Sequence, residues 1–455
     1  MSDTYRYLLG ENDIPKSWYN INPDMPVDIG PVLDPQTKKP ATFEYLANLF
    51  PKRFLEENIS MDRWVDIPEP VREIYKIWRP SPLVRARRLE KALDTPAHIY
   101  YKFEGVSPVG SHKPNSAIPQ AFYAKEEGIK SLVTETGAGQ WGSALSMACN
   151  FFGIDCTVFM VRVSYDQKPF RRIVMQSYGA KVIPSPSDQT EYGRSLLTQN
   201  PDHLGSLGIA ISESIDAISH SNGELRYALG SGLGAVLMHQ TVVGLEAQKQ
   251  FDMAGEYPDI LVGCIGGGSN FAGFTFPFLR EKLTEGKKMR VIAVEPVACP
   301  SLTKGVYAFD YVDSQGIGPI AKVYTLGHDF IPPSIHAGGL RLHFMAQHVS
   351  ALYEHGDIEA VAVSQESIFE AAVKFLRAEG FIPAPESAHA VKVAIDEAIK
   401  CREEGVSKVI ALNVSGHGLL DLSAYDQYLR GTLQDTSYPT KEVEVALGNL
   451  PIIKE

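Results

Sequence analysis

The sequence has few cysteines, no long apolar run and no excess of positive charge, and each shortage argues against a class of protein. Five cysteines are scattered through 455 residues without a Cys-x-x-Cys pair, which predicts reduced thiols in the cytoplasm rather than a disulfide framework or a metal site. No apolar stretch approaches membrane-spanning length, and the first residues lack the pattern of a signal peptide. A net charge of −11 argues against a nucleic-acid or anionic-membrane surface.

The composition is that of a globular protein that buries a sizeable core, with 44% hydrophobic and 21% charged residues. Short Val- and Ile-rich runs alternate with amphipathic stretches from about residue 95. This alternation predicts an α/β fold with mostly parallel sheets covered by helices on both faces. The predicted strands are 98–104, 131–135, 156–162, 181–185, 259–266, 290–296 and 408–416, and the clearest predicted helices are 116–127, 142–152, 168–178 and 367–379.

Two stretches depart from this alternation. Residues 1–60 are rich in Pro, Asn, Asp and aromatic residues, which predicts an extended arm that wraps the body of the protein. Residues 184–208 are polar and turn-rich, which predicts a mobile segment.

The stretch CIGGGSNFAGFTFPFL (264–279) leads from an apolar strand through three glycines into a predicted helix. Glycines allow close approach of the backbone to a ligand, and the first N–H groups of the helix suit a phosphate. A plain tight turn would need one glycine, so three favour an anion site. The motif is neither a Walker A loop nor G-x-G-x-x-G, although a dinucleotide is the natural competing ligand.

A second glycine-rich turn follows another predicted strand, in TETGAGQWGSA (134–144). Gly137 and Gly139 allow successive N–H groups to form a nest for a carboxylate. Glu135 lies at the end of the strand, where parallel sheets place their active sites, although taken alone it is better explained as a solvated carboxylate near the helix N-terminus.

The stretch SPVGSHKPNSA (107–117) places Lys113 near the start of a helix, where most lysines are ordinary surface residues. A lysine combined with a phosphate loop and a carboxylate nest is, however, the arrangement that pyridoxal phosphate requires: the amine forms a Schiff base, and the two loops hold the phosphate and the amino-acid carboxylate. In NVSGHG (413–418), Ser415 offers a neutral partner for the pyridine nitrogen. A neutral partner favours β-elimination and β-replacement over transamination.

Seven motifs in this order resemble those of the tryptophan synthase β subunit family, most closely its divergent second class. They cover about residues 80–430 and read GSHKPNSA, ETGAGQWG, SYDQKPFRRIVMQSYGAKVIPSPS, GSLGIAISE, GGGSN, GFIPAPESAHA and NVSGHG. The resemblance implies a type II pyridoxal-phosphate-dependent fold with two three-layer α/β domains and the cofactor between them. The larger domain would comprise 61–111 and 231–430 and the smaller one 112–230, with a mobile substrate-closing segment, and 431–455 would form a tail.

The resemblance also implies roles for individual residues. Lys113 would carry the cofactor and move the α-proton, and Glu135 would be the acid/base that orients the nucleophile. The other implied cofactor contacts are His112, Asn115, Gln140, Gly230, Ser231, Gly266, Gly267, Gly268, Ser269, Asn270, Glu386 and Ser415. The implied substrate contacts are Glu135, Thr136, Gly137, Ala138, Gly139, Gln140, Trp141 and Arg341.

The chain also differs from the first class of β subunits. Trp141 replaces the usual histidine, residues 1–60 exceed the usual N-terminus, and the region 164–195 differs on the face that would dock an α subunit. The divergence in 164–195 argues against a stable α partnership. The family resemblance implies a homodimer, and the sequence does not decide whether a monovalent cation is needed.

The expected reaction is the joining of indole to L-serine or O-phospho-L-serine to give L-tryptophan. A serine deaminase, a β-replacement enzyme with another nucleophile and a non-catalytic relative are the alternatives. Arg341 stands where the first class has an aspartate that receives the serine hydroxyl, and a guanidinium binds phosphate through paired N–H groups. A structural salt bridge is the competing role for Arg341.

Overall fold

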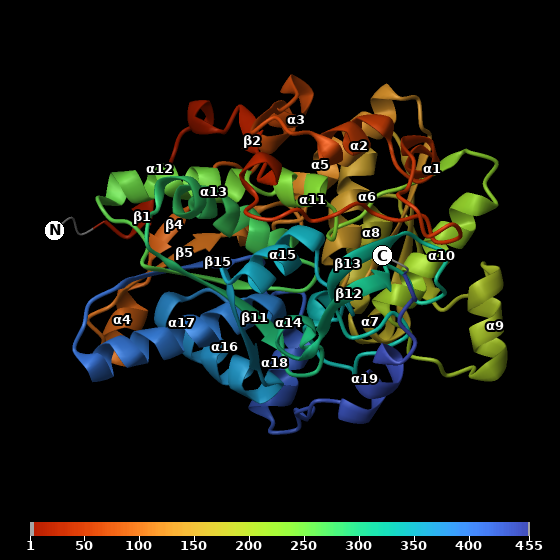
Figure 1. Cartoon of the computed structure of the whole chain (residues 1–455). Helices are drawn as coiled ribbons and strands as arrows, with labels where there is room; N and C mark the ends of the chain where they lie inside the picture. The colour runs from red at the N-terminus through yellow and green to blue at the C-terminus, as the bar shows by residue number, and fades with distance from the viewer. Residues whose placement is uncertain (1–3, 454–455) are drawn as a thin grey trace.

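The computed structural model describes residues 4–453 and contains two main β-sheets with helices packed on both faces (Figure 1). The first three residues of the predicted arm and the last two of the predicted tail lie outside the described residues. The larger sheet has the strand order β1 (Arg6–Tyr7), β4 (Leu83–Arg85), β5 (His98–Phe103), β15 (Val409–Val414), β10 (Ile260–Cys264), β11 (Arg290–Pro296) and β14 (Glu359–Val363). The strands from β5 to β14 are parallel, whereas β1 and β4 pair antiparallel.

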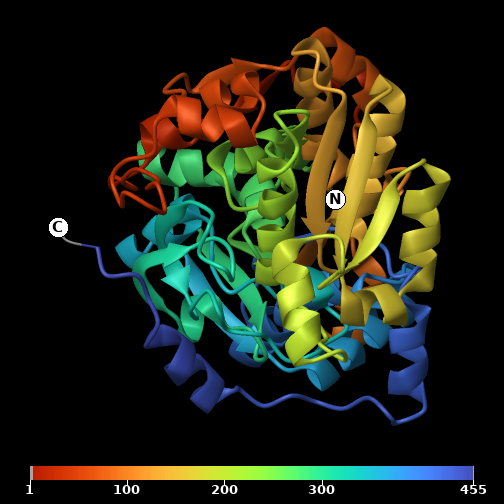
Figure 2. The same cartoon turned by 90° about the vertical axis from the view of Figure 1, so that its right-hand side faces the viewer.

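The smaller sheet is parallel throughout and is visible in amber and yellow in Figure 2. Its strand order is β8 (Lys181–Ser185), β7 (Asp155–Val161), β6 (Ser131–Thr136) and β9 (Leu225–Tyr227). The helices that pack around it are α5 (Pro114–Glu126), α6 (Gln140–Phe152), α7 (Arg162–Gln167), α8 (Pro169–Ser177), α9 (Glu191–Gln199) and α10 (Leu207–Ser219).

The larger sheet is buried on both faces because alternate residues of its central strands enter different cores. Leu261 of β10 packs in one core, whereas Ile260 and Val262 pack in the other. The first core includes residues of α12 (Val242–Ala254) and α13 (Ser269–Glu285), and the second includes α4 (Arg87–Leu93), α16 (Gln365–Glu379) and α17 (Pro385–Glu404). This three-layer arrangement confirms the predicted fold class.

The predicted strands and the clearest predicted helices all form, with ends within about two residues of the expected positions. The sequence reading did not identify the short strands β1, β4, β9 and β14, the hairpin of β12 (Val306–Tyr311) and β13 (Ile320–Thr325), or the pair of β2 (Ser17–Tyr19) and β3 (Trp64–Asp66). The other α-helices beyond the arm are α3 (Glu69–Tyr75), α11 (Gly234–His239), α14 (Ser301–Lys304), α15 (Gln347–His355), α18 (Leu422–Leu429) and α19 (Thr440–Leu447). The domain boundaries at 112 and 230 stay a prediction.

The arm is less extended than its composition suggested, because it contains helices α1 (Phe43–Leu49) and α2 (Lys52–Ile59). Thr42 caps α1 by accepting a hydrogen bond from the Tyr45 N–H at 3.2 Å. Glu127 of the body caps α2 by accepting from the N–H groups of Lys52 and Arg53. The second cap comes from a residue 74 to 75 positions away, so the helix depends on tertiary contacts that the local sequence does not reveal.

Within residues 4–453, no helix combines the length and the apolar character needed to cross a bilayer. The same described residues contain no group of three or more His, Cys, Asp or Glu side chains arranged to hold a metal ion.

Candidate active site

A cavity of about 160 Å³ lies at the carboxyl ends of strands from both sheets. The residues that follow β6, β10 and β15 meet there, as expected for parallel strands. The wall includes most of the predicted site residues: His112, Lys113, Glu135, Thr136, Gly137, Ala138, Gln140, Trp141, Gly230, Ser231, Gly266, Gly267, Gly268, Ser269, Asn270, Glu386 and Ser415.

Lys113 lies immediately before the first turn of α5, and its side chain forms part of the cavity wall. Its Nζ donates to the Gly230 carbonyl oxygen at 2.6 Å and to Ser269 Oγ at 2.9 Å. Burial lowers the pKa of Lys113 to about 8, although the nearby Glu135 carboxylate favours the charged form. About one tenth of this amine is therefore neutral, and so nucleophilic, at pH 7, which is far more than for an ordinary lysine.

The glycine-rich loop between β10 and α13 is shaped to receive an anion. A Cβ at Gly266 would lie 2.5 Å from the Gly339 carbonyl oxygen, and a Cβ at Gly267 would lie 2.4 Å from Ser231 Oγ. Gly268, at φ +108°, begins helix α13 in the left-handed region that favours glycine. Among residues 4–453, no group accepts a hydrogen bond from the N–H of any of these three glycines. Their N–H groups and the helix N-terminus therefore form a preformed phosphate cradle.

The turn between β6 and α6 has the same construction. Gly139 adopts φ +93° and begins the 13-residue helix α6. A side chain at Gly137 is excluded because its Cβ would lie 2.5 Å from the Gly338 carbonyl oxygen. The turn lines the cavity with Thr136, Gly137, Ala138 and Gln140, so it can present backbone N–H groups to a carboxylate.

Glu135, the penultimate residue of β6, is held in a poorly solvated position beside this turn. Burial raises the pKa of its carboxyl to about 7, while hydrogen bonds from the hydroxyls of Tyr227 and Thr134 and the charge of Lys113 oppose the rise. A carboxyl with such a pKa can both accept and release a proton near neutrality. Glu135 is therefore suited to acid/base chemistry and is not a solvated surface carboxylate.

Uncharged side chains surround Ser415 in the cavity wall. Ser415 Oγ lies 2.8 Å from Ser387 Oγ and 3.7 Å from Cys264 Sγ. Burial lowers the pKa of His112 to about 3, so its ring is uncharged between the Ser415 carbonyl oxygen at 3.3 Å and Ser269 Oγ at 3.4 Å. A ring nitrogen of a ligand placed against Ser415 would therefore meet a hydroxyl and not a charged group.

Glu386 is also part of the cavity wall. It accepts hydrogen bonds from Gln140 Nε2 at 3.1 Å and from the Gly339 N–H at 3.0 Å. Gln140 begins α6 beside the smaller sheet, whereas Glu386 lies in the first turn of α17 beside the larger one. The hydrogen bond between Gln140 and Glu386 therefore connects a helix of the smaller sheet to a helix of the larger sheet at the cavity.

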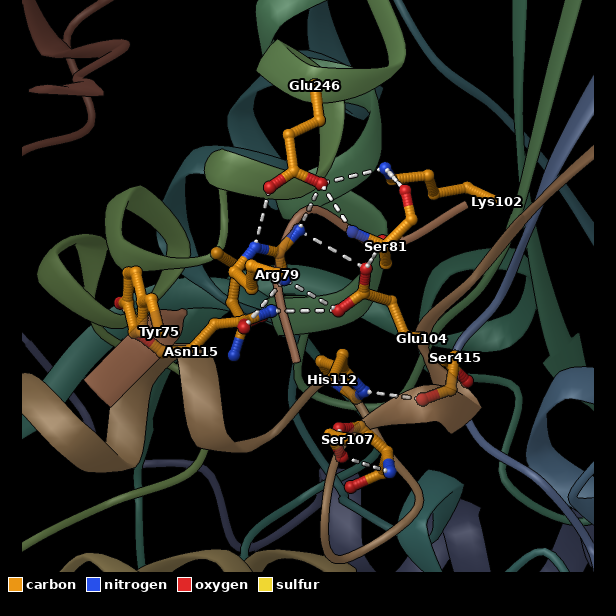
Figure 3. A network of polar contacts seen from close by, with 12 residues as sticks. Tyr75, Arg79, Ser81, Lys102, Glu104, Ser107, His112, Asn115, Glu246 and Ser415 are labelled. Carbon is orange, nitrogen blue, oxygen red and sulfur yellow. Dashed lines mark hydrogen bonds and ion pairs between the residues drawn. The ribbon is translucent and has the colours of Figure 1, made fainter. Parts of the chain in front are cut away.

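Asn115 lies outside the cavity wall, in a buried polar cluster (Figure 3). Its Nδ2 donates to Glu104 at 3.1 Å, and its Oδ1 accepts from Arg79 at 2.8 Å. Asn115 thus contacts the cluster that supports the first turn of α5. The family resemblance implies a cofactor contact for Asn115, whereas its side chain lies in this cluster.

Gly139 and Arg341 also lie outside the cavity wall. Gly139 faces the side chain of Arg171, because a Cβ added at Gly139 would lie 2.8 Å from the Arg171 Cβ. Arg341 is buried and donates from Nη2 to the Pro332 carbonyl oxygen at 2.5 Å, while its Nε has no partner. Within the described residues, no carboxylate lies within 4.0 Å of the Arg341 guanidinium, so the competing structural salt bridge is absent.

Several cavity residues were missed by the sequence reading. Cys264, the last residue of β10, lines the cavity immediately before the glycine loop. The arm contributes an apolar wall made by Val32, Leu46, Leu49, Phe50 and Leu55. The i, i+3, i+4 spacing of Leu46, Leu49 and Phe50 signals an amphipathic helix, but not the partner that it covers.

The donor set fits pyridoxal phosphate. A neutral amine is available to its aldehyde at Lys113, unpaired backbone N–H groups are available to its phosphate, and the Ser415 hydroxyl is available to its ring nitrogen. The close approaches at Gly266 and Gly267 leave no space for side chains in the cradle, which explains why the loop consists of glycines.

Comparisons with known proteins agree with this geometry. Residues 74–416 match the family model described as pyridoxal-phosphate dependent enzyme. The tomato (Solanum lycopersicum) threonine deaminase isoform 2 has a similar structure, with a TM-score of 0.59 and 17% identity over 83% of this chain and 92% of that chain. The O-acetyl serine sulfhydrylase isoform 3 of Entamoeba histolytica has a TM-score of 0.57 and 16% identity over 84% and 96% of the two chains. At these identities the structures share the fold alone.

Sequence relatives are much closer. The chain is 57% identical to the tryptophan synthase beta chain 2 of Aeropyrum pernix, over 96% of this chain and 98% of that protein. It is also 57% identical to the tryptophan synthase beta chain 2 of Aquifex aeolicus, over 94% of this chain and 100% of that protein. The chain therefore belongs to the tryptophan synthase β chain family of pyridoxal-phosphate-dependent enzymes.

Proposed function

We propose that this enzyme joins indole to the three-carbon unit of L-serine or O-phospho-L-serine and thereby forms L-tryptophan. The supporting observation is that one cavity combines the Lys113 amine and the phosphate cradle with a large apolar wall. Leu207, Ile211 and Phe344 belong to that wall. A serine deaminase needs no such compartment, whereas an uncharged aromatic nucleophile does.

Pyridoxal phosphate would be held by Lys113, by the Gly266–Asn270 loop and by Ser415 at the ring. When bound, it supplies an electron sink for bonds broken at the α and β carbons of an amino acid. Gly230, Ser231, Gln140, Glu386 and the neutral His112 are the remaining cavity residues assigned to its surroundings.

The chain's own groups bind, orient and move protons. The turn at Thr136–Gln140 would hold the substrate carboxylate through backbone N–H groups and so fix the position of the α carbon. Lys113, with a pKa of about 8, would take and return the α-proton. Glu135, with a pKa of about 7, would protonate the departing β-substituent and then accept a proton from the indole.

Trp141 does not supply an acid or base, because an indole N–H is a donor only. Its Nε1 donates to Thr134 Oγ1 at 2.7 Å, and its ring packs so closely on Gly230 that a Cβ there would be 2.6 Å away. Trp141 therefore sets the position of the backbone at Gly230, whose carbonyl oxygen accepts from Lys113.

The phosphoserine alternative depends on Arg341. Burial lowers the pKa of this arginine to about 10, and no carboxylate among the described residues pairs with it. A buried guanidinium without a counter-charge would gain from a phosphate ligand. Its neighbours Leu340 and Leu342 line the cavity although Arg341 does not, so a direct contact requires its side chain to change rotamer.

The decisive experiment supplies indole with L-serine, O-phospho-L-serine or L-threonine and measures tryptophan and keto acid separately. We expect tryptophan from serine or phosphoserine, and Arg341→Ala should reduce phosphoserine turnover far more than serine turnover. Keto acid formation that is unaffected by indole would support the deaminase instead. Equal losses on both donors would remove Arg341 from the leaving-group site.

We further propose that the enzyme is a cytoplasmic homodimer that works without a stable α subunit. The homodimer is what the family resemblance implies, and the absence of a stable α partner is inferred from the divergent sequence of the region 164–195 on the face that would dock an α subunit. Light scattering of the purified holoenzyme, alone and with an α subunit added, tests this. A monomeric holoenzyme, or a stable complex with the α subunit, would contradict it.

A further inference from the structure

The N-terminal arm forms part of the active-site cavity. Leu46 and Leu49 of α1, Phe50 between the two helices and Leu55 of α2 line the same cavity as Lys113. In Figure 1 these helices lie along the upper edge of the molecule, near α5, α6 and α11. The arm therefore covers the apolar end of the cavity and is not only an outer wrapping.

Buried polar contacts hold the arm in this position. Glu57 of α2 accepts from Tyr123 Oη at 2.5 Å and pairs with His239 Nε2 at 2.8 Å. The side chains of Glu57 and His239 are 2% and 0% exposed, so water does not weaken the pair. Asn58 Oδ1 also accepts from the Ala235 N–H at 3.1 Å. These contacts to α5 and α11 fix Phe50 and Leu55 relative to the cavity.

A short chain of contacts connects the arm to the acid/base residue. The rings of Phe50 and Tyr227 pack with centroids 5.6 Å apart, and the Tyr227 hydroxyl donates to the Glu135 carboxylate. Both aromatic side chains are buried, at 5% and 4% exposure. The groups that face Glu135 are Tyr227 of β9, Thr134 of β6 and Lys113 before α5. A change at Phe50 therefore reaches Glu135 through a single intervening side chain.

We infer that Phe50 has two linked roles: it forms the wall that the indole ring contacts, and it is a positioning residue that holds Tyr227 against Glu135. This inference rests on the proposed function. The first role requires the ring surface of Phe50 in the cavity. The second requires the hydroxyl of Tyr227, because donation to the carboxylate stabilises the ionised form of Glu135. Substitutions can therefore separate the two roles.

The test compares four holoenzyme variants in the presence of serine and varied indole. Phe50→Ala removes the wall and the ring contact, Phe50→Leu keeps apolar bulk, and Tyr227→Phe keeps the ring but removes the hydroxyl. Phe43→Ala is the matched control, because Phe43 lies on the same arm, is half-buried and does not line the cavity. The measurements are KM for indole, KM for serine, and the pH profile of tryptophan formation.

Phe50→Ala should raise KM for indole at least about tenfold, because the indole loses one aromatic contact. KM for serine should stay nearly unchanged. Phe50→Leu should recover most of the affinity for indole. Tyr227→Phe should keep KM for indole but shift the limb of the pH profile near 7 to higher pH by about one unit, as expected when a hydrogen bond to a carboxylate is lost. Phe43→Ala should match the wild type.

Two results would overturn the inference. One is a KM for indole in Phe50→Ala equal to that in Phe43→Ala, and the other is a pH profile that Tyr227→Phe does not move. If Phe50→Ala fails to fold, Phe50→Leu and Tyr227→Phe still decide the matter. Failure of the proposed function is a separate result, since the wild-type holoenzyme would then make no tryptophan from indole.

Discussion

Glu104 lies in a fully buried cluster of four charges beneath the first turn of α5 (Figure 3). Arg79 and Lys102 supply two positive charges, and Glu104 and Glu246 supply two negative ones. Glu104 accepts from Arg79 at 2.9 and 3.3 Å, from Asn115 at 3.1 Å and from the Ser81 hydroxyl. Replacing Glu104 with glutamine keeps the volume but leaves one positive charge uncompensated.

The structure gives the size of the loss. Burial disfavours the ionised carboxylate, but Arg79 and Lys102 outweigh burial and lower the pKa of Glu104 from 4.5 to about 2. This difference corresponds to about 3 kcal/mol. Breaking one partner of a buried ion pair independently costs about 3–5 kcal/mol. Glu104→Gln should therefore reduce the free energy of unfolding by about 3 kcal/mol at pH 7.

Urea unfolding of the apoenzyme, followed by tryptophan fluorescence, measures this loss. Since the pKa of Glu104 is depressed in the folded state, its stabilisation is present above pH 4.5 and disappears as the pH falls toward 2. The difference between wild type and variant should shrink over that range. Glu73→Gln is the matched control, because Glu73 pairs with Lys76 on the surface and should change stability little. A loss in Glu104→Gln no larger than in this control would refute the reasoning.

Three further predictions concern the site. Lys113→Ala should abolish the visible absorption of the bound cofactor together with tryptophan synthesis, and a spectrum equal to that of the wild type would contradict the assignment. Glu135→Ala should retain the cofactor spectrum while tryptophan formation falls by about 10²–10⁴-fold in a steady-state assay, and normal synthesis would exclude the acid/base role. Because burial lowers the pKa of Lys113 to about 8 and the neutral amine is the nucleophile, capture of pyridoxal phosphate by the apoenzyme should rise with pH to a half-maximal rate near 8. Stopped-flow absorbance would measure that rate, and a midpoint near 10 would show that Lys113 is not desolvated.

The sequence predicted those parts of the site whose backbone conformation depends on a single short stretch of the chain. The turn that ends at Gly268 needs a left-handed conformation, and its glycines, strand and helix are adjacent in the chain. The same holds for the turn after Glu135. The predicted strands were found for a similar reason, because central parallel strands such as β10 are apolar throughout.

The features that the sequence reading missed depend on residues far apart in the chain. Asn115 contacts Arg79, 36 positions away, so its neighbours and not its closeness to Lys113 determine where it lies. Phe50 reaches the cavity through the packing of α2 on α11, which no local pattern encodes. The sequence shows that Arg341 carries a guanidinium able to bind an anion. The direction of its side chain, however, depends on the loop that carries Pro332.

The proposed reaction in this cavity is the joining of indole to a serine-derived unit. The most direct measurement incubates the purified holoenzyme, without any α subunit, with indole and either L-serine or O-phospho-L-serine, and quantifies tryptophan, residual indole and keto acid by chromatography. Tryptophan should appear in amounts equal to the indole consumed. Keto acid accumulation with indole unconsumed, for both donors, would contradict it.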